Sequence, residues 1–523
     1  MVIFRQRPSM TRSNRFITGL LSSYAAIGVN ILFTLASVPL ALHYLDKEEF
    51  GLWALVTQLS GYLMLLEFGM SGSVARSLSD HKDQIEDGIY GSILRTGARV
   101  FAIQGVLVAL LGLAVAWFAV PFLGLPSRLQ QPFTILMAAQ AVLSGFRLSL
   151  GALGSPLWCH QRLDLSNLAS SVSLFSTFAA LWAGFHFGWH LYSLSISTAV
   201  GSLLGSLLIY YFCRRLGFYP SDENRGRFDP LLFRELFRFG GGLFMMNLGA
   251  QLATTSQVVI ISRMLGMEAA AVWSISTKIF GFAQQFVSRV LDSSAGGLAE
   301  MVVRKESNQL KKRFHDLVSI SAMMAVAASA GIALMNGAFV EIWTSGIITW
   351  NPWNDLLLAC LLFSTAINRC HTSLVGISKQ IKGMKYIYLL EGLVFVLMSV
   401  LLIPTMNFSG LLIAALLCNI LLTGVYGVRH TSEYFDISPR DVIRWLMPSS
   451  RILLAIALLF VATCTSTLAQ LNPTSRLIMG GAVFFVIIAP LIWFFGLGSD
   501  IRAEAIRFVN GIREQLKLKF KIV

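Results

Sequence analysis

Three cations lie deep within apolar stretches of this sequence: Arg147, Lys278 and Arg369. A charge at the centre of a bilayer costs roughly 2.5–3.5 kcal/mol on insertion scales, so such a residue usually faces the interior of a helix bundle or water. Arginine can also donate two parallel hydrogen bonds to a phosphate. We therefore expect these cations to line a wet cavity and to bind an anion there. The competing interpretation is that their long side chains extend to the lipid headgroups.

Neutral polar residues continue the helical faces that carry the two arginines, because residues three and four apart share one side of a helix. The first face comprises Gln140, Ser144, Arg147 and Gly151. The second face has the same spacing and one flanking amide, and comprises Thr365, Arg369, Thr372, Gly376 and Asn368. We include Gln140, Ser144 and Asn368 among the candidate substrate-binding residues.

A third polar face is expected around Lys278, on a helix that also carries Arg289 and Asp292. The helix before it presents Asn247 and Gln251, which are one turn apart. Arg289, Asn247 and Gln251 are further candidates for binding a substrate. Two other interpretations stay open: Arg289 pairs with Asp292, and the two amides form hydrogen bonds between helices.

Acidic residues are scarce within the apolar stretches. Glu67, Glu391 and Asp292 are the candidates for carrying a coupling proton or sodium ion, and the alternative is that each neutralises a neighbouring arginine. The six cysteines form no CxxC pair, so we expect neither a disulfide framework nor a metal site. The sequence contains no GxxxxGK[ST] phosphate loop. We therefore expect no ATP hydrolysis and no cofactor.

Long apolar segments must position these residues. The chain of 523 residues is 55% hydrophobic and 13% charged, with a mean hydropathy of +0.67, whereas an ordinary globular chain is about one quarter charged. About 20 apolar residues in a helix cross the hydrocarbon of a bilayer, and a helix satisfies its own backbone polar groups there. The sequence predicts an all-α polytopic membrane protein with about fourteen spans: 16–42, 50–72, 94–119, 132–155, 165–187, 190–212, 240–262, 268–292, 317–342, 355–378, 384–403, 408–427, 452–469 and 477–497.

The basic residues predict the orientation of these spans. One set of alternate hinges carries only Lys47, Arg128, Arg263 and Arg476, while most other Lys and Arg residues lie at the termini and on the remaining hinges. The positive-inside rule places those basic regions, including both termini, in the cytoplasm. The net charge of +14 is therefore explained by orientation, and we expect no nucleic-acid partner.

An internal repeat organises the spans. At an offset of 220 residues, segment 45–62 aligns with segment 265–282 through the pairs Glu48–Glu268, Trp53–Trp273 and Gly61–Gly281. Chance similarity between two apolar segments is the alternative. Six expected spans separate the copies, which gives a parallel repeat with a pseudo-twofold axis along the membrane normal. We expect an N-terminal lobe over 1–226, a C-terminal lobe over 227–436, and an addition over 437–523 with the last two spans and a basic amphipathic cytoplasmic tail.

The run LDKEEFGLWALVTQLSGYLMLLEFGMSGSVARSLSD at 45–80 resembles the polysaccharide exporter, or O-antigen-type flippase, family of the multidrug/oligosaccharidyl-lipid/polysaccharide exporter superfamily. The matching features are the Glu49-Phe50-Gly51 run, Trp53 and the Phe68-Gly69 pair. The resemblance implies two six-helix lobes with alternating access in the bacterial cytoplasmic (inner) membrane. It also implies a polyprenyl-diphosphate-linked glycan as cargo, moved to the outer leaflet for surface polysaccharide assembly. Membrane lipids, a polysaccharide polymerase and glycosyltransferases are the implied partners.

Other functions remain open at this point. A cation-coupled multidrug exporter of the same superfamily would favour carboxylates around cationic drugs, yet the first expected span contains no Asp or Glu. A count of fourteen spans is similar to that of the peptidoglycan-precursor flippases. A non-transporting scaffold would not need buried polar faces. An enzyme is disfavoured because the expected external hinges are too short for a catalytic loop.

Overall fold

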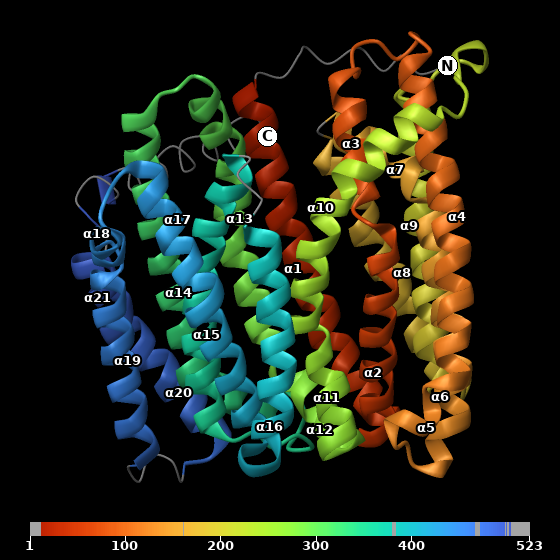
Figure 1. Ribbon diagram of the computed structural model, residues 1–523. Coiled ribbons are helices and arrows are strands. Elements are labelled where there is room, and N and C mark those ends of the chain that lie inside the picture. Colours follow the sequence, from red (N-terminus) through yellow and green to blue (C-terminus); the bar gives the residue numbers. More distant parts are fainter. Residues whose placement is uncertain are drawn as a thin grey trace, which may run out of the picture. The chain divides into compact units, whose positions relative to one another are not determined.

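The computed structural model describes residues 12–160, 162–378, 383–465, 471–496, 498 and 502–503. Within these ranges the regular elements are all helices, and no strand occurs (Figure 1). The all-α prediction is therefore confirmed. The basic amphipathic tail expected at the C-terminus lies outside the described residues, apart from Arg502 and Ala503.

The helices of the first half follow the expected spans, and several spans consist of two shorter helices. In chain order they are α1 (Arg12–Tyr44), α2 (Lys47–Leu63), η1 (Met64–Glu67), α3 (Met70–Asp80), α4 (Ile89–Phe118), α5 (Val120–Leu123), α6 (Ser127–Ser149), α7 (Gly151–Cys159), α8 (Leu163–His186), α9 (Tyr192–Arg215), η2 (Asp222–Asn224), α10 (Pro230–Thr254), α11 (Ser256–Leu265) and α12 (Met267–Ser276).

The second half continues in the same way, and three of its short elements are turns of π-helix. Its elements are α13 (Lys278–Val303), α14 (Ser307–Trp343), α15 (Pro352–Ile377), α16 (Met384–Cys418), η3 (Asn419–Gly424), α17 (Val425–Phe435), α18 (Pro439–Arg444), α19 (Met447–Thr465), α20 (Pro473–Val483), η5 (Phe484–Ile488), α21 (Ala489–Leu491) and η6 (Ile492–Gly496).

Nine helices of the described ranges are long and apolar enough to cross a membrane, or ten when α6 and α7, which meet at 45°, count as one span. The expected eighth span falls on α12, which has 10 residues, and on α13, which carries Lys278, Arg289 and Asp292. The division into two helices and the three charged residues explain why the expected eighth span is not among the nine. The chain is a multi-pass membrane protein, and the count of fourteen stays a prediction.

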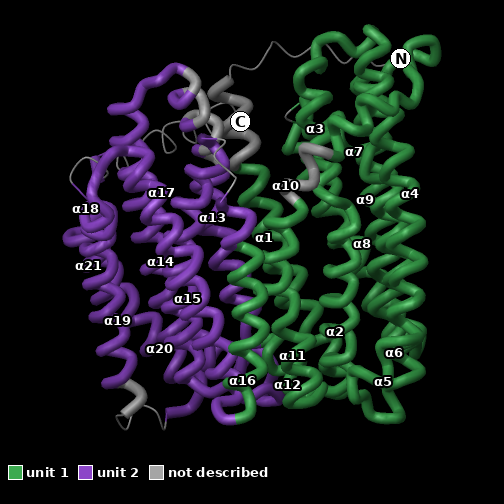
Figure 2. Tube along the Cα trace, viewed as in Figure 1, with its two compact units in different colours: residues 1–275, 388–404 green, residues 276–387, 405–523 purple. Residues whose placement is uncertain are grey.

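The chain forms two compact units, shown in different colours in Figure 2. Unit 1 comprises Met1–Ile275 and Tyr388–Pro404, and unit 2 comprises Ser276–Ile387 and Thr405–Val523. Part of α16 thus groups with the first unit. The lobe boundary expected at residue 227 is a different kind of division, based on the repeat, and it stays a prediction.

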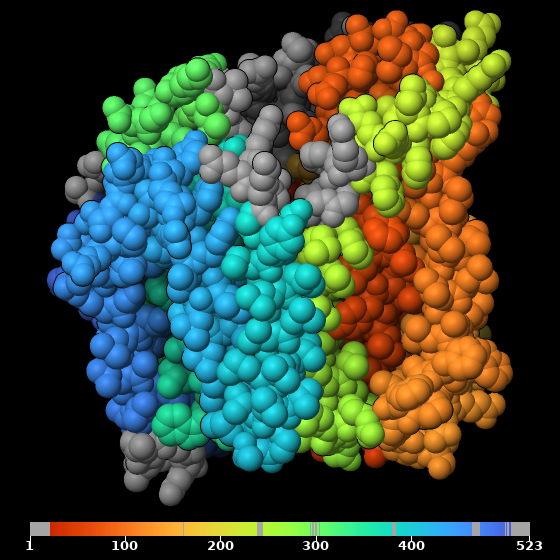
Figure 3. All heavy atoms as spheres, in the orientation of Figure 1, coloured from red at the N-terminus to blue at the C-terminus, as the bar shows by residue number. Residues whose placement is uncertain are grey.

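Helices α4 and α6 of unit 1 pack closely along their length, as the orange helices and atoms of Figures 1 and 3 show. Small residues permit this approach, because a Cβ added to Gly105 would lie 2.3 Å from the carbonyl oxygen of Gly145. Apolar side chains are exposed elsewhere on α4, including Ile103, Val106 and Trp117. Such exposure is costly in water and is expected where lipid covers the helix.

The repeated segment begins α2 with a complete cap. The Asp46 carboxylate accepts a hydrogen bond from the Glu49 backbone N–H at 2.8 Å, and the Glu49 carboxylate accepts one from the Asp46 N–H at 3.0 Å. This capping box satisfies two donors that a helix start would otherwise leave free. Burial raises the pKa of the Asp46 carboxyl, but bonds from Arg128 and from the backbone outweigh it, so this pKa lies below its usual value.

Gly51 brings the two copies of the repeat together. A Cβ at Gly51 would lie 2.0 Å from the carbonyl oxygen of Met267 and 3.3 Å from the backbone nitrogen of Ala271. Ala271 is the residue that aligns with Gly51 at the offset of 220. Equivalent positions of α2 and α12 are therefore in contact, as expected near a pseudo-twofold axis.

Left-handed backbone at a non-glycine residue accompanies two of the helix breaks in the described spans. Phe68 (φ 53°) and Gly69 (φ 68°) both adopt left-handed backbone and separate η1 from α3. Asn407 (φ 50°) bends α16 three residues after Pro404. Left-handed backbone is costly for a bulky residue such as Phe68. A break of this kind within a membrane span exposes backbone groups that a continuous helix would satisfy, and it is a common place for a binding site.

Candidate functional site

A pocket of about 350 Å³ lies in unit 1 beside the break between α2 and α3. Helix α10 supplies its other wall. The pocket is lined by Met64, Leu65, Glu67, Phe68, Gly69, Phe244, Asn247, Ala250, Gln251 and Thr254. Glu67, Asn247 and Gln251 were predicted for separate roles in ion coupling and substrate binding, and the structure brings the three together.

Glu67 lies where η1 ends. Its carboxylate accepts a hydrogen bond from the Ser71 N–H at 2.9 Å, so it caps the first turn of α3. Its backbone oxygen accepts a hydrogen bond from Gln104 Nε2 of α4 at 3.0 Å. A carboxylate held in this way, and facing a pocket, can bind a proton, a sodium ion or a sugar hydroxyl.

Amide and aromatic groups form the rest of the pocket. Asn247 is exposed, and its amide has no partner in the described part of the chain. Gln251, one turn further, accepts a hydrogen bond from the Thr255 hydroxyl. The ring of Phe68 lies 4.7 Å from the ring of Phe244. Amides that both donate and accept hydrogen bonds, together with aromatic faces, suit a polyhydroxylated group as well as an organic cation.

Arg147 and Lys278 carry charges that the described structure does not balance. Arg147 is exposed in the last turn of α6, immediately before the bend at Leu150. Lys278 is the first residue of α13 and its side chain is exposed. Neither makes an ion pair or a side-chain hydrogen bond within the described ranges. Arg289 is half-buried further along α13 and likewise has no partner among described residues.

Arg369 and Asp292 are partners of each other. Arg369 of α15 donates a hydrogen bond to the Asp292 carboxylate of α13 at 2.9 Å, and the side chains are 52% and 43% exposed. The sequence had placed Arg369 with the substrate and Asp292 with the coupling ion, and it had paired Asp292 with Arg289 as an alternative. An ion pair this exposed contributes only about 0–1 kcal/mol to stability in water. It therefore leaves both groups able to exchange partners.

Three candidates are buried between helices. Gln140 of α6 donates to the Ser195 hydroxyl of α9 at 3.4 Å. Asn368 of α15 donates to both the backbone and the side-chain oxygen of Asn419 at 2.8 Å. Ser144 is buried one turn from Gln140. In this structure Gln140 and Asn368 bond to other helices, which is the interhelical role that polar side chains commonly have in membranes.

Glu391 is buried on α16 beside a close helix contact. A Cβ on the next residue, Gly392, would lie 2.6 Å from the Gly249 carbonyl oxygen of α10. Glu391 is thus next to the contact between α10 and α16, whereas Glu67 faces the pocket.

The aromatic and backbone walls of the pocket were not predicted. Phe68 and Gly69 were noted only as a matching pair, and Phe244 was not considered. A Phe-Gly pair inside an expected span is the signal that was available, because glycine marks positions of left-handed backbone. Phe244, Asn247 and Gln251 follow the spacing of one helical face, which would have added Phe244 to the site.

The helices define a multi-pass membrane protein, and the break between α2 and α3 gives it a polar pocket. Residues 17–295 match the family model described as "Polysaccharide biosynthesis protein", which is more than half of the 523 residues. The chain belongs to this polysaccharide biosynthesis family. Among curated proteins, none matches the chain by sequence.

Solved structures with a similar fold are transporters of the MOP superfamily or a lipid flippase. An inward-facing multidrug resistance MATE family transporter matches with a TM-score of 0.66 and 12% identity, over 77% of this chain and 94% of that chain. The lipid II flippase MurJ, in an inward closed conformation, matches with a TM-score of 0.63 and 13% identity, over 91% and 99%. A MOP superfamily transporter from Pyrococcus furiosus Vc1 matches with a TM-score of 0.60 and 13% identity, over 81% and 97%. At these identities the likeness establishes the fold alone.

Proposed function

We propose that this protein is a flippase for a polyprenyl-diphosphate-linked oligosaccharide. It moves its cargo from the cytoplasmic to the outer leaflet of the bacterial inner membrane, by alternating access and for surface polysaccharide assembly. Both termini lie in the cytoplasm. Glycosyltransferases complete the cargo before this step, and a polymerase uses it afterwards.

The observation that carries the proposal concerns two cations, Arg147 near the end of α6 in unit 1 and Lys278 at the start of α13 in unit 2. Each lacks a partner among the described residues. Two unit charges 4 Å apart interact by about 4 kcal/mol at an effective dielectric near 20. An unbalanced cation in an apolar environment therefore attracts a diphosphate and repels a cationic drug. The family match supports a glycan as cargo, and the fold shared with a lipid II flippase supports a lipid-linked one.

The remaining candidates have distinct parts in this proposal. Arg147 and Lys278 each attract the diphosphate during transport, while the amides of Asn247 and Gln251 bind sugar hydroxyls in the pocket. Arg369 also attracts the diphosphate when Asp292 releases it, and Arg289 lies on the same helix as Lys278. Uptake of a proton or a sodium ion at Glu67 supplies the coupling, which makes a carboxylate at the helix break part of the transport cycle.

Charge substitutions test the proposal. Glycan at the cell surface is measured in a deletion strain that carries R147A, K278A, R147K or K278R, with the amount of protein in the membrane measured for each. We expect R147A and K278A to lower surface glycan at least about tenfold, since loss of a charge-assisted bond costs about 1.5–3 kcal/mol. R147K and K278R should retain part of the export.

The matched control is R214A, which removes one exposed cation at the end of α9. This variant should export normally, because Arg214 lies outside the pocket and the apolar part of its helix. Full export by both R147A and K278A, at wild-type amounts of protein, would overturn the proposal.

A multidrug exporter is the second candidate, because Glu67 beside Phe68 and Phe244 also suits an organic cation. The deletion strain separates the two functions. Loss of glycan with unchanged drug susceptibility supports the flippase, and the reverse pattern supports the exporter. Rescue of a strain depleted of its peptidoglycan-precursor flippase would identify that precursor as the cargo instead.

A further inference from the structure

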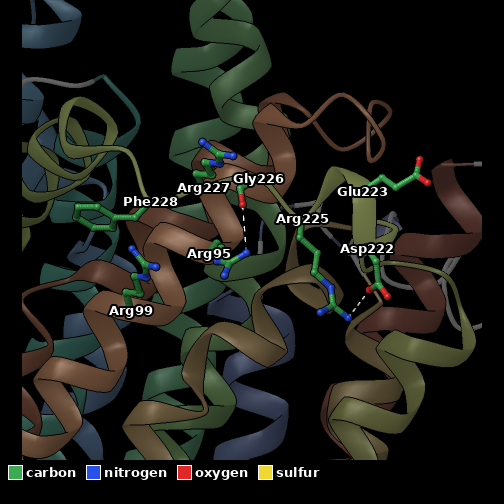
Figure 4. Close-up of a pocket in the computed structure, with 8 residues that line it drawn as sticks. All are labelled: Arg95, Arg99, Asp222, Glu223, Arg225, Gly226, Arg227 and Phe228. Atoms are coloured by element: carbon green, nitrogen blue, oxygen red, sulfur yellow. Dashed lines mark hydrogen bonds and ion pairs between the residues drawn. The ribbon is translucent and has the colours of Figure 1, made fainter.

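A second pocket, of about 610 Å³, lies in unit 1 outside the site described above. It forms where the segment between α9 and α10 crosses the first turns of α4 (Figure 4). Its volume is within the roughly 300–1,000 Å³ of small-molecule sites. The lining residues are Arg95, Arg99, Asp222, Glu223, Arg225, Gly226, Arg227 and Phe228.

The segment that closes this pocket is fixed to α4. A Cβ at Gly226 (φ 62°) would lie 2.3 Å from the Ser92 nitrogen, so the chain approaches the helix backbone directly. On the other side, the Glu86 carboxylate accepts bonds from the Ser221 hydroxyl at 2.5 Å and from Asn224 Nδ2 at 2.8 Å. These bonds hold the pKa of Glu86 below its usual value. The pocket is therefore formed before any ligand arrives.

The charge of the pocket is positive and incompletely balanced. Arg225 pairs with Asp222 at 2.5 Å, and Figure 4 shows the Glu223 carboxylate pointing away from the other arginines. Arg95, Arg99 and Arg227 remain, and they form no ion pair within the described residues: their charges are free to bind an anion.

Existing contacts orient two of these guanidinium groups. Arg95 donates one hydrogen bond to the Gly226 carbonyl oxygen at 3.3 Å, which leaves its other N–H groups available. Arg99 lies over the ring of Phe228, 5.5 Å from its centroid. Stacking on a ring face leaves the N–H groups at the edge of the guanidinium plane free to bind a phosphate. Pre-oriented guanidinium groups lose little entropy when they bind.

Exposed apolar residues lie close in sequence to the residues that line the pocket. Leu231, three residues after Phe228, is 78% exposed near the start of α10, and Ile89, six residues before Arg95, is 51% exposed at the start of α4. A free phosphate would make no use of these side chains, whereas a lipid presents its phosphate beside acyl chains. The orientation predicted from the basic residues puts this region at the cytoplasmic leaflet, where anionic lipids attract basic groups.

We propose that Arg95, Arg99 and Arg227 bind the headgroup phosphate of an anionic phospholipid from the cytoplasmic leaflet, with the acyl chains beside Ile89 and Leu231. The site is independent of the flippase proposal. It anchors the segment between α9 and α10, which joins the two expected lobes, to the membrane surface.

Lipid binding to the purified full-length protein tests this proposal. The protein in detergent is titrated with phosphatidylglycerol or with phosphatidylcholine of the same acyl chains, and bound lipid is counted by native mass spectrometry. Wild type should prefer phosphatidylglycerol. The R95Q/R99Q variant should lose that preference by about tenfold or more, since each basic residue near an anionic lipid contributes about a fivefold change.

Two further variants make the result specific. R227Q removes a guanidinium that bonds to nothing among the described residues, so it leaves the fold intact and should weaken binding by about fivefold. R214Q/R215Q also removes two positive charges, as R95Q/R99Q does, but at the end of α9 and outside the pocket. It should change lipid binding by less than about threefold. Equal losses in R95Q/R99Q and R214Q/R215Q would reduce the effect to general surface charge and overturn the proposal.

Inorganic pyrophosphate distinguishes a lipid phosphate from a soluble one. Displacement of phosphatidylglycerol from wild type by pyrophosphate, with no such competition in R95Q/R99Q, supports phosphate recognition in this pocket. Binding of pyrophosphate without any preference for phosphatidylglycerol over phosphatidylcholine would overturn the assignment to a lipid.

Discussion

Substitution of Gly51 by alanine should be strongly destabilising, although alanine is the better helix former. The added methyl group would lie 2.0 Å from the Met267 carbonyl oxygen and 2.8 Å from its carbonyl carbon. Both atoms belong to backbone, so no side-chain rotation can relieve the clash. The two helices would have to separate by roughly 1.5 Å to restore an ordinary contact distance of about 3.5 Å.

Gly61 supplies a matched control on the same helix. A Cβ there would meet only the Thr255 side chain, at ordinary distances of 3.5 Å to Cγ2 and 3.9 Å to Oγ1. G61A should therefore gain up to about 1 kcal/mol from helix propensity. G51A receives the same gain but pays about 1–3 kcal/mol for overpacking, and more if α12 cannot move. The free energies of unfolding of the two variants should differ by about 1–3 kcal/mol.

Thermal unfolding of the purified protein in one detergent measures this difference. We expect the apparent Tm of G51A to lie below that of G61A by about 3 °C or more, together with less protein in the membrane. If G51A were as stable as G61A, α2 and α12 would not meet at the aligned positions of the repeat. The pseudo-twofold arrangement of the two segments would then be refuted.

Three further predictions concern carboxylates. E67Q keeps an oxygen for the Ser71 N–H but cannot ionise, so surface glycan should fall at least about tenfold while the apparent Tm stays near that of wild type; normal export would remove Glu67 from coupling. D292N should change the free energy of unfolding by less than about 1 kcal/mol, because the ion pair of Asp292 with Arg369 is exposed. A larger loss of stability would show that this ion pair holds the fold together. Folding lowers the pKa of Glu86, so its ionised carboxylate stabilises the segment 219–229 at pH values above 4.5, the ordinary pKa of the group. This stabilisation is lost as the pH falls below that value. The amide hydrogen exchange rate of that segment, corrected for intrinsic rates, should rise at pH 4, and in E86Q it should already be faster at pH 7. An exchange rate that does not depend on pH would show that the bonds from Ser221 and Asn224 to Glu86 do not hold the segment.

Three of the residues that carry the family resemblance have structural roles in this fold. Glu49 completes the cap of α2, Phe50 is buried, and Gly51 permits the contact with α12. None of these three residues lines either pocket, whereas Phe68 and Gly69, at the other end of the same run, line the pocket beside the break between α2 and α3. The Glu49-Phe50-Gly51 part of the run therefore fixes how the repeat is assembled and carries no information about the cargo.

The site could be predicted only in part. The sequence identified Glu67, Asn247 and Gln251 one at a time, because burying a polar residue in an apolar segment costs free energy and therefore indicates a functional or structural role. That they share a pocket was not predictable, since Glu67 is some 180 residues from Asn247 and their meeting depends on the break at Phe68. The same holds for Arg369, whose partner Asp292 is on another helix.

The sequence by itself determined the membrane character, the helices near all the expected spans, and the repeat. Those properties follow from the thickness of the hydrocarbon and from backbone hydrogen bonding, which act on each segment separately. Only the tertiary structure decided which polar groups are paired, which are buried and which line a pocket. Such outcomes depend on helix breaks and on contacts of a few ångströms between segments far apart in the chain, and hydropathy does not encode them.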